Sequence, residues 1–154
     1  MSREVEYLKQ WALQHVKNRD LYYRKIQSLE EQETGFLITR KDGERHIYLV
    51  IPFLESTAFL ETLKPYQHCT VVAVQCKENL QFLVQHWKEF AQFKKMFSMI
   101  FAHPASHTEK CWMLYPMTHD LVTEDKSLKT GLESVAVNTE YTTREQFMKG
   151  ATHD

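Results

Sequence analysis

The stretch "VVAVQCKENLQFLVQHWKEF", residues 71–90, contains both kinds of element from which this fold is built. Its first residues, 71–74, form a continuous apolar and mostly β-branched run that is typical of a buried strand. Its later apolar residues recur at helical spacing and are Leu80, Leu83, Val84, Trp87, Phe90 and Ala91. A buried strand that is reached through one helix and followed by another indicates an α/β protein in which the strand is parallel to a neighbour.

The residues before this stretch predict a helix and a group of antiparallel strands. Helical spacing from Val5 to Val16, with Ser2 as a cap, predicts a first helix. Residues 22–32 show weak alternation and are expected to form a partly exposed strand. In "GFLITRKDGERHIYLVIPFL", residues 35–54, Asp42-Gly43 separates two β-rich runs, which predicts a hairpin of strands 36–40 and 46–51.

The remaining segments complete one domain. A short helix is expected over residues 56–63, a long helix over 79–94, strands within 95–104 and 110–117, and a last helix that begins at Asp125. Residues 138–154 have little apolar periodicity and are expected to be a loosely docked or mobile tail. The expectation is a single α/β domain, residues 1–137, whose mixed sheet is covered by helices on both faces.

Net charge, cysteine spacing and the length of apolar runs each bear on which classes of function fit this sequence. The 154 residues include 19 Lys plus Arg against 20 Asp plus Glu, a net charge of -1, so net charge does not indicate nucleic-acid binding over the whole surface. The three cysteines have no C-x-x-C spacing and are expected to be reduced thiols of a cytoplasmic protein. No window approaches eighteen consecutive apolar residues, so no membrane span is expected.

The predicted element order over residues 3–116 resembles that of the restriction-endonuclease-like superfamily, the PD-(D/E)xK nucleases. In that family an acid on the second strand and the acid of the (D/E)xK motif on the third bind Mg²⁺, and the lysine polarises the phosphate or positions the attacking water. The resemblance places Gln75-Cys76-Lys77 at the second of these positions, with glutamine in place of the acid. Glu6 would match a supporting acid on the first helix.

The hairpin strands 36–40 and 46–51, which precede Gln75, depart from this pattern because they contain no acid. The nearest carboxylates, Asp42 and Glu44, lie in the hairpin turn, and an Mg²⁺ site needs oxygen ligands with negative charge. We therefore expect a catalytically inactive, nuclease-like binding or assembly module with no metal and no cofactor. The alternative that stays open is a nuclease that uses Mg²⁺ with Gln75, Lys77 and either Glu44 or Asp42.

Two clusters pair aromatic rings with cations, "YYRK" at 22–25 and "FKK" at 93–95. Such clusters can stack bases and hold phosphates, so nucleic-acid contacts are considered for Tyr22, Arg24, Lys25, Lys94 and Lys95. The acids that lie close in sequence, such as Glu30, Glu31 and Glu89, favour a mixed solvated surface instead.

Two further patterns bear on metals and partners. His103, His107 and Cys111 are zinc-ligand types at spacings of four, but Pro104 disfavours a helix there, and a solvated loop is the preferred interpretation. The strands between residues 96 and 117 are rich in Met and aromatic side chains, which are enriched at interfaces. They predict a homodimer or another protein as the partner.

Overall fold

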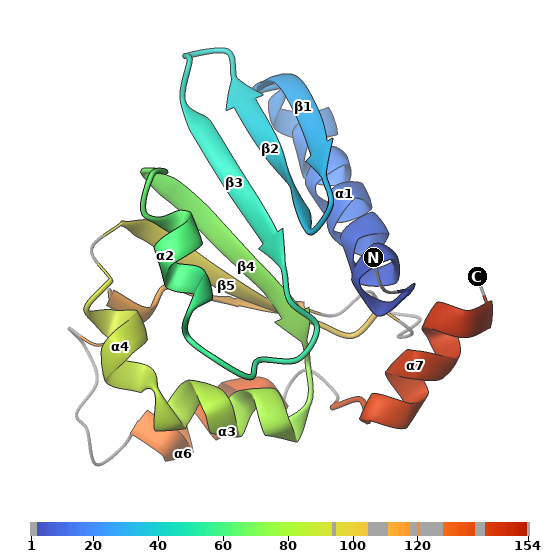
Figure 1. Ribbon diagram of the computed structural model, residues 1–154, viewed down its shortest axis with the longest axis vertical. Coiled ribbons are helices and arrows are strands. Elements are labelled where there is room, and N and C mark those ends of the chain that lie inside the picture. Colours follow the sequence, from blue (N-terminus) through green and yellow to red (C-terminus); the bar gives the residue numbers. More distant parts are fainter. Residues whose placement is uncertain are drawn as a thin grey trace.

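The chain forms a mixed six-stranded sheet with helices on both faces (Figure 1), as predicted. The computed structural model describes residues 3–93, 95–104, 111–117, 120, 128–137 and 141–153. Neighbouring strands follow the order of the sequence: β1 (Ile26–Gln32), β2 (Gly35–Arg40), β3 (Arg45–Val50), β4 (His68–Val74), β5 (Met96–Ala102) and β6 (Cys111–Leu114).

Strand directions follow from the connections. The β2–β3 hairpin is antiparallel and turns at Gly43, whose φ is 90°, while the Asp42 carboxylate accepts a hydrogen bond from the Glu44 N–H at 2.9 Å. Strand β1 is antiparallel to β2, β6 is antiparallel to β5, and β4 is parallel to both β3 and β5. The predicted hairpin and the predicted parallel strand are therefore confirmed.

The two faces of the sheet are covered by different helices. Helices α1 (Arg3–Tyr23) and α7 (Arg144–His153) lie on the face that receives Val72 and Val74 of β4. The opposite face receives Val71 and Ala73 and is covered by α2 (Phe59–Leu63), α3 (Lys77–Gln85), α4 (Trp87–Ala91) and α6 (Leu128–Val137). Figure 1 shows α2 in front of β4, with α3 and α4 below it. Because successive strand residues point to opposite faces, β4 contributes to both cores.

The helix predicted over residues 79–94 is two helices. The chain leaves helical geometry at His86, with φ −110° and ψ 22°, so α3 ends at Gln85 and α4 begins at Trp87. The change of direction keeps Trp87 inside the core, where its indole N–H donates to Asp120 at 2.8 Å. Apolar spacing placed the buried ring correctly but carried no signal for the break.

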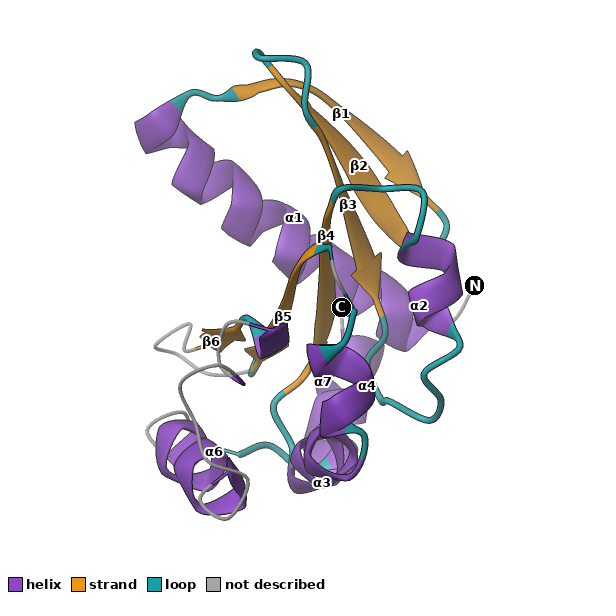
Figure 2. Cartoon of the chain, turned by 90° about the vertical axis from the view of Figure 1, so that its left-hand side faces the viewer, coloured by secondary structure: helices purple, strands orange, loops and turns teal. Residues whose placement is uncertain are grey.

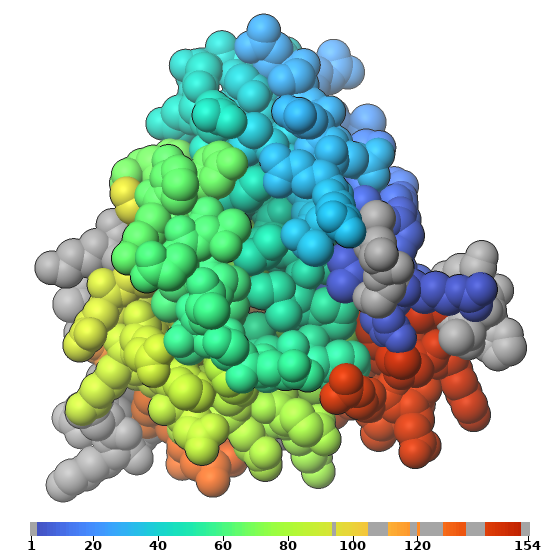
Figure 3. All heavy atoms as spheres, viewed as in Figure 1, coloured from blue at the N-terminus to red at the C-terminus, as the bar shows by residue number. Residues whose placement is uncertain are grey.

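The C-terminal segment corrects the expectation of a loosely docked tail over residues 138–154. Residues 144–153 form α7, and Phe147 is only 1% exposed, with its ring centroid 5.5 Å from that of Tyr7 and 5.6 Å from that of Phe53. Figure 3 shows the red C-terminal residues lying against the blue N-terminal ones. One large apolar side chain anchors this helix, which is too few for a periodicity to be visible in the sequence. The Asp125 cap, predicted for the helix now seen as α6, falls outside the described residues.

Candidate functional site

Gln75 closes the carboxyl end of β4. Its side chain is 1% exposed and accepts a hydrogen bond from the Trp112 indole N–H at 2.6 Å. Its backbone N–H donates to the Ala102 carbonyl, and its own carbonyl accepts from Thr142. Lys77, two residues later, is exposed at the start of α3. The two outer residues of the Gln75-Cys76-Lys77 motif therefore stand in opposite environments, one sealed and one in solvent.

Asn79 seals the same end of the sheet from inside α3. Its Oδ1 accepts from the Leu54 N–H, and its Nδ2 donates to the carbonyls of Pro52 and Val74, all at 2.8 Å. The side chain is 1% exposed. The loop after β3, the end of β4 and the start of α3 are thus joined by one buried amide.

The carboxylates considered for a metal site lie at the other end of the sheet. Asp42 and Glu44 occupy the β2–β3 turn, and Glu44 approaches His68, the first residue of β4, at 3.2 Å. Seven residues of extended chain separate His68 from Gln75, a distance of about 20 Å. The structure therefore does not bring Asp42 or Glu44 to Gln75 and Lys77. Gln75 also follows the fourth strand of the sheet, not the third.

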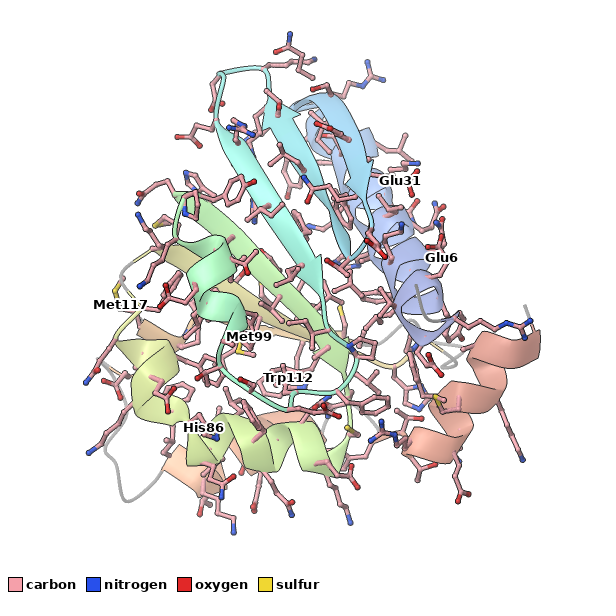
Figure 4. All side chains as sticks on the ribbon, in the orientation of Figure 1. Glu6, Glu31, His86, Met99, Trp112 and Met117 are labelled. Carbon is pink, nitrogen blue, oxygen red and sulfur yellow. The ribbon has the colours of Figure 1, made fainter. Side chains whose placement is uncertain are left out.

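Glu6 belongs to a separate network between α1 and β1. It pairs with Lys9 at 3.2 Å, and Lys9, although charged, is buried and also donates to the Gln32 carbonyl. A hydrogen bond from Gln10 and the neighbouring Lys9 lower the pKa of Glu6. Figure 4 shows Glu6 and Glu31 on the side of α1 and β1, away from Trp112. The supporting acid suggested by the resemblance therefore pairs with Lys9, and Lys9 connects the helix to the edge strand β1.

A pocket of about 280 Å³ opens at the amino ends of β3, β4 and β5. Its floor consists of strand side chains on the α1 face of the sheet, and its wall is formed by the last turns of α1 and by the residues that follow this helix. Figure 2 shows the C-terminal end of α1 projecting from the sheet on the side where β6 lies. A pocket is therefore present at the amino ends of these strands, whereas the buried side chains of Gln75 and Asn79 fill the carboxyl end of β4.

A chain of hydrogen bonds crosses the pocket floor from β2 to β5. Arg40 Nη2 lies 3.3 Å from His46 Nδ1, His46 Nε2 lies 2.8 Å from Thr70 Oγ1, and this oxygen lies 2.8 Å from Ser98 Oγ. A guanidinium group only donates, so Nδ1 must accept and the ring hydrogen must be on Nε2, which donates to Thr70. Thr70 also forms a hydrogen bond with Tyr48, so the hydroxyl groups of the floor belong to one connected group.

The same chain argues against nucleophilic catalysis by Thr70 or Ser98. A general base must accept a proton from the nucleophile, but His46 donates to Thr70, and its other nitrogen faces Arg40. Burial, followed by the charges of Arg40 and His68, lowers the pKa of His46 from 6.5 to about 3. The ring is therefore neutral near pH 7, and it accepts a hydrogen bond from Arg40 while donating one to Thr70.

Three cations from different elements line the pocket: Arg19 on α1, Lys25 just after α1, and Arg40 on β2. None of the three forms an ion pair with any residue that the structure describes. Burial raises the pKa of Tyr48, and the charges of Arg19 and Arg40 both oppose that rise, so both guanidinium groups lie near this hydroxyl. The field inside the pocket favours an anion.

Asp20 is the single carboxylate of the described pocket lining, and its side chain is hydrogen-bonded to backbone groups. Its Oδ1 accepts from the backbone N–H groups of Lys25 at 2.7 Å and Ile26 at 3.1 Å. It thereby holds the tight turn at Arg24, whose φ of 51° is left-handed and whose N–H donates to the Asp20 carbonyl. Three cations against one carboxylate leave two positive charges on the described lining.

The candidate nucleic-acid residues are only partly brought together. Lys25 lines the pocket, and Tyr22 and Arg24 are exposed beside it. Lys95 is near Cys69, whose pKa burial raises to about 11 while the Lys95 charge acts in the opposite direction. Cys69 packs in the core on the α3 side of the sheet, away from the pocket floor. Lys94 lies outside the described residues.

The residues considered for zinc do not converge within the part of the chain that the structure describes. His103 follows β5 and is buried, and its Nδ1 has no hydrogen-bond partner there. Cys111 pairs with Ala102, so its side chain faces the sheet side opposite to that of His103. His107 lies outside the described residues, and no group of three metal-ligating side chains is present among those described.

Sequence reasoning missed most of the pocket: Arg19, Arg40, His46, Thr70 and Ser98. One signal was present in the sequence. Strands β3, β4 and β5 each carry a polar residue near their start, within a mostly apolar run. These residues are His46, Thr70 and Ser98. Nothing local indicated that Arg19 and Arg40 would meet them.

Several large apolar side chains remain exposed around the same end of the sheet: Leu21, Tyr22, Tyr23, Met96, Tyr115 and Met117. The homodimer predicted from the Met- and aromatic-rich strands stays a prediction. No helix among the described residues is both long and apolar enough to cross a bilayer. Comparisons with protein-family models, with curated proteins and with solved structures give no match to this chain.

Proposed function

We propose that this domain is a binding module without catalytic activity, and that it holds an anionic ligand in the pocket at the amino ends of β3–β5. The observation that carries the proposal is the convergence of Arg19, Lys25 and Arg40 on one cavity without an ion-pair partner among the described residues. Cations that lack carboxylate partners retain their capacity to bind an external anion.

The restriction-endonuclease-like architecture is part of this proposal. A first helix, three antiparallel strands, a helix and a parallel strand support it. On this basis the family's acids belong on β2 and β3, where the residues lining the pocket are Ile38, Arg40, His46 and Tyr48. One cation and neutral groups at these positions provide no negatively charged ligand for a divalent cation, which supports an inactive module over the metal-dependent nuclease.

A cytoplasmic location completes the proposal. Cys69, Cys76 and Cys111 are free thiols, as is usual for proteins of reducing compartments. Burial raises the pKa of each thiol, which keeps the groups protonated and unreactive.

Binding of inorganic phosphate, followed by chemical-shift changes in NMR spectra, tests the anion site. We expect the shifts to centre on β3–β5 and the end of α1, and Arg19→Gln to weaken binding by about fivefold or more because one charge-assisted donor is lost. Lys17→Gln removes the same charge from an exposed position of α1 that does not line the pocket, and should leave binding nearly unchanged. Equal losses in both variants, or shifts centred elsewhere, would count against the site.

The nuclease alternative has its own test. We expect no cleavage of single- or double-stranded DNA or RNA with Mg²⁺ or Mn²⁺, because the candidate ligands Asp42 and Glu44 lie about 20 Å from Gln75. Metal-dependent cleavage that disappears in Gln75→Ala and in Lys77→Ala, with both variants folded, would establish the alternative.

A further inference from the structure

We propose that the pocket is a phosphate-monoester site whose ligand also carries a planar ring, as a mononucleotide does. This inference rests on the proposed anion site and names its ligand class. The features that carry it are the charge balance of the pocket, its hydrogen-bond donors, the aromatic rings at its mouth and its size.

The charge balance suits a doubly charged anion. Arg19, Lys25 and Arg40 oppose only Asp20 among the described lining residues, and two positive charges remain. A phosphate monoester carries between one and a half and two negative charges near pH 7, whereas a carboxylate carries one. The match in charge therefore favours a phosphate monoester over a simple carboxylate.

The donors suit a tetrahedral oxyanion. Two guanidinium groups and an ammonium group approach from the wall and from β2, and the floor carries the Thr70–Ser98 hydroxyl pair. Arg40 donates a hydrogen bond to His46, and His46 donates one to Thr70, so the donors point toward that hydroxyl pair. Phosphate presents three terminal oxygens in a tetrahedral arrangement and can accept from donors that do not share a plane, whereas the lone pairs of a carboxylate lie near one plane.

The mouth of the pocket carries aromatic rings in solvent. Tyr23 and Tyr115 both line the pocket, yet are 59% and 49% exposed, and Tyr22 beside them is 85% exposed. The Lys25 ammonium group lies 5.8 Å from the centre of the Tyr23 ring, so a cation and an aromatic face occur together at the rim. Exposed aromatic faces next to a phosphate site are stacking platforms for a base.

The volume limits the ligand. About 280 Å³ is at the lower end of small-molecule pockets, which span about 300–1,000 Å³. One nucleotide fits this scale if its base stacks at the mouth, while a dinucleotide cofactor exceeds it. The ligand is therefore a small molecule and not a nucleic-acid strand.

Calorimetry with defined probes tests this assignment on the full chain. The probes are inorganic phosphate, the four ribonucleosides, the four ribonucleoside 5′-monophosphates and a ten-nucleotide single strand of thymidines without terminal phosphates. We expect at least one monophosphate to bind about tenfold or more tightly than phosphate or its own nucleoside, because the two halves of the site then act together. The single strand should bind more weakly than that monophosphate.

Variants separate the two halves of the site. Arg19→Gln should weaken phosphate and the monophosphate by similar factors, because both lose the same charge contact. Tyr23→Ala and Tyr115→Ala, both at exposed positions that tolerate substitution, should weaken only the monophosphate, by about fivefold or more for the ring that stacks. Lys17→Gln is the matched control and should change neither affinity.

The outcomes are distinguishable. Phosphate binding without any advantage for a monophosphate would overturn the nucleotide assignment and leave the anion site standing. A single strand that binds more tightly than every monophosphate would replace the small ligand with a nucleic acid. Failure of phosphate and of all monophosphates to bind would remove both proposals together.

Discussion

The two ends of the central parallel strands carry different polar side chains, which have different hydrogen-bond partners. The carboxyl ends of β4 and β5 are closed by the buried amides of Gln75 and Asn79, whose hydrogen bonds are directed inward to the indole of Trp112 and to backbone groups. The amino ends are open and carry the Thr70–Ser98 hydroxyl pair below three cations. In open α/β sheets the carboxyl end is the usual ligand site. Here the amides at that end hydrogen-bond within the fold, whereas three cations at the amino end have no ion-pair partner among the described residues.

This difference shows what separates a structural polar group from a site. A buried amide with all its partners inside the protein contributes stability and has nothing left for a ligand. A cation or hydroxyl without a full set of internal partners can still bind a ligand. The closed end should therefore respond to mutation in folding stability, and the open end in binding.

The largest stability effect is expected from Asn79→Ala at the closed end. The change leaves the Leu54 N–H and the Val74 carbonyl without this partner in a buried position, and should lower the free energy of unfolding by about 3 kcal/mol. Chemical denaturation measures it. Glu78→Ala, at the exposed neighbouring position of α3, is the control and should change it by less than about 0.5 kcal/mol. Similar small effects from both would mean that this end is not sealed by Asn79.

His46 makes the open end sensitive to acid. Its pKa of about 3 in the folded protein lies below the ordinary value of 6.5, so between these values the unfolded chain binds a proton that the folded chain does not. Stability contributed by the neutral ring is therefore complete above pH 6.5 and is lost as pH falls, by up to about 1.4 kcal/mol per pH unit.

Denaturation of the wild type and of His46→Gln at pH 7, 5.5 and 4.5 isolates this effect. Glutamine is neutral throughout, and His15, His68 and Asp20 are the same in both proteins, so the difference between the two curves reports His46. The wild type should lose more stability than the variant on acidification. Parallel losses would show that His46 titrates normally and is not held by Arg40 and Thr70.

The smallest of the three effects concerns the Gln75-Cys76-Lys77 motif. Gln75→Leu leaves the Trp112 indole N–H without its acceptor and should cost about 2 kcal/mol. Lys77→Ala removes an exposed side chain and should cost less than about 0.5 kcal/mol. Neither change should weaken phosphate binding at the open end. A loss of phosphate binding in Lys77→Ala would move the site to the carboxyl ends of the strands.

Local patterns in the sequence predicted most elements of the fold. Asp42-Gly43 predicted the hairpin because a left-handed glycine is what its turn requires, and the apolar run at residues 71–74 predicted a buried strand. The break at His86 and the docked helix around Phe147 were missed. Both depend on distant partners, such as Asp120 for Trp87 and Tyr7 for Phe147.

The sequence by itself determined an α/β chain with a hairpin, a parallel strand and no acid within the two strands of that hairpin. Only the tertiary structure decided which end of the sheet is closed. Strand register places His46, Thr70 and Ser98 on one face, and the direction in which α1 leaves the sheet brings Arg19 over them. Register and helix direction are set by packing between residues far apart in the chain, which no local pattern encodes.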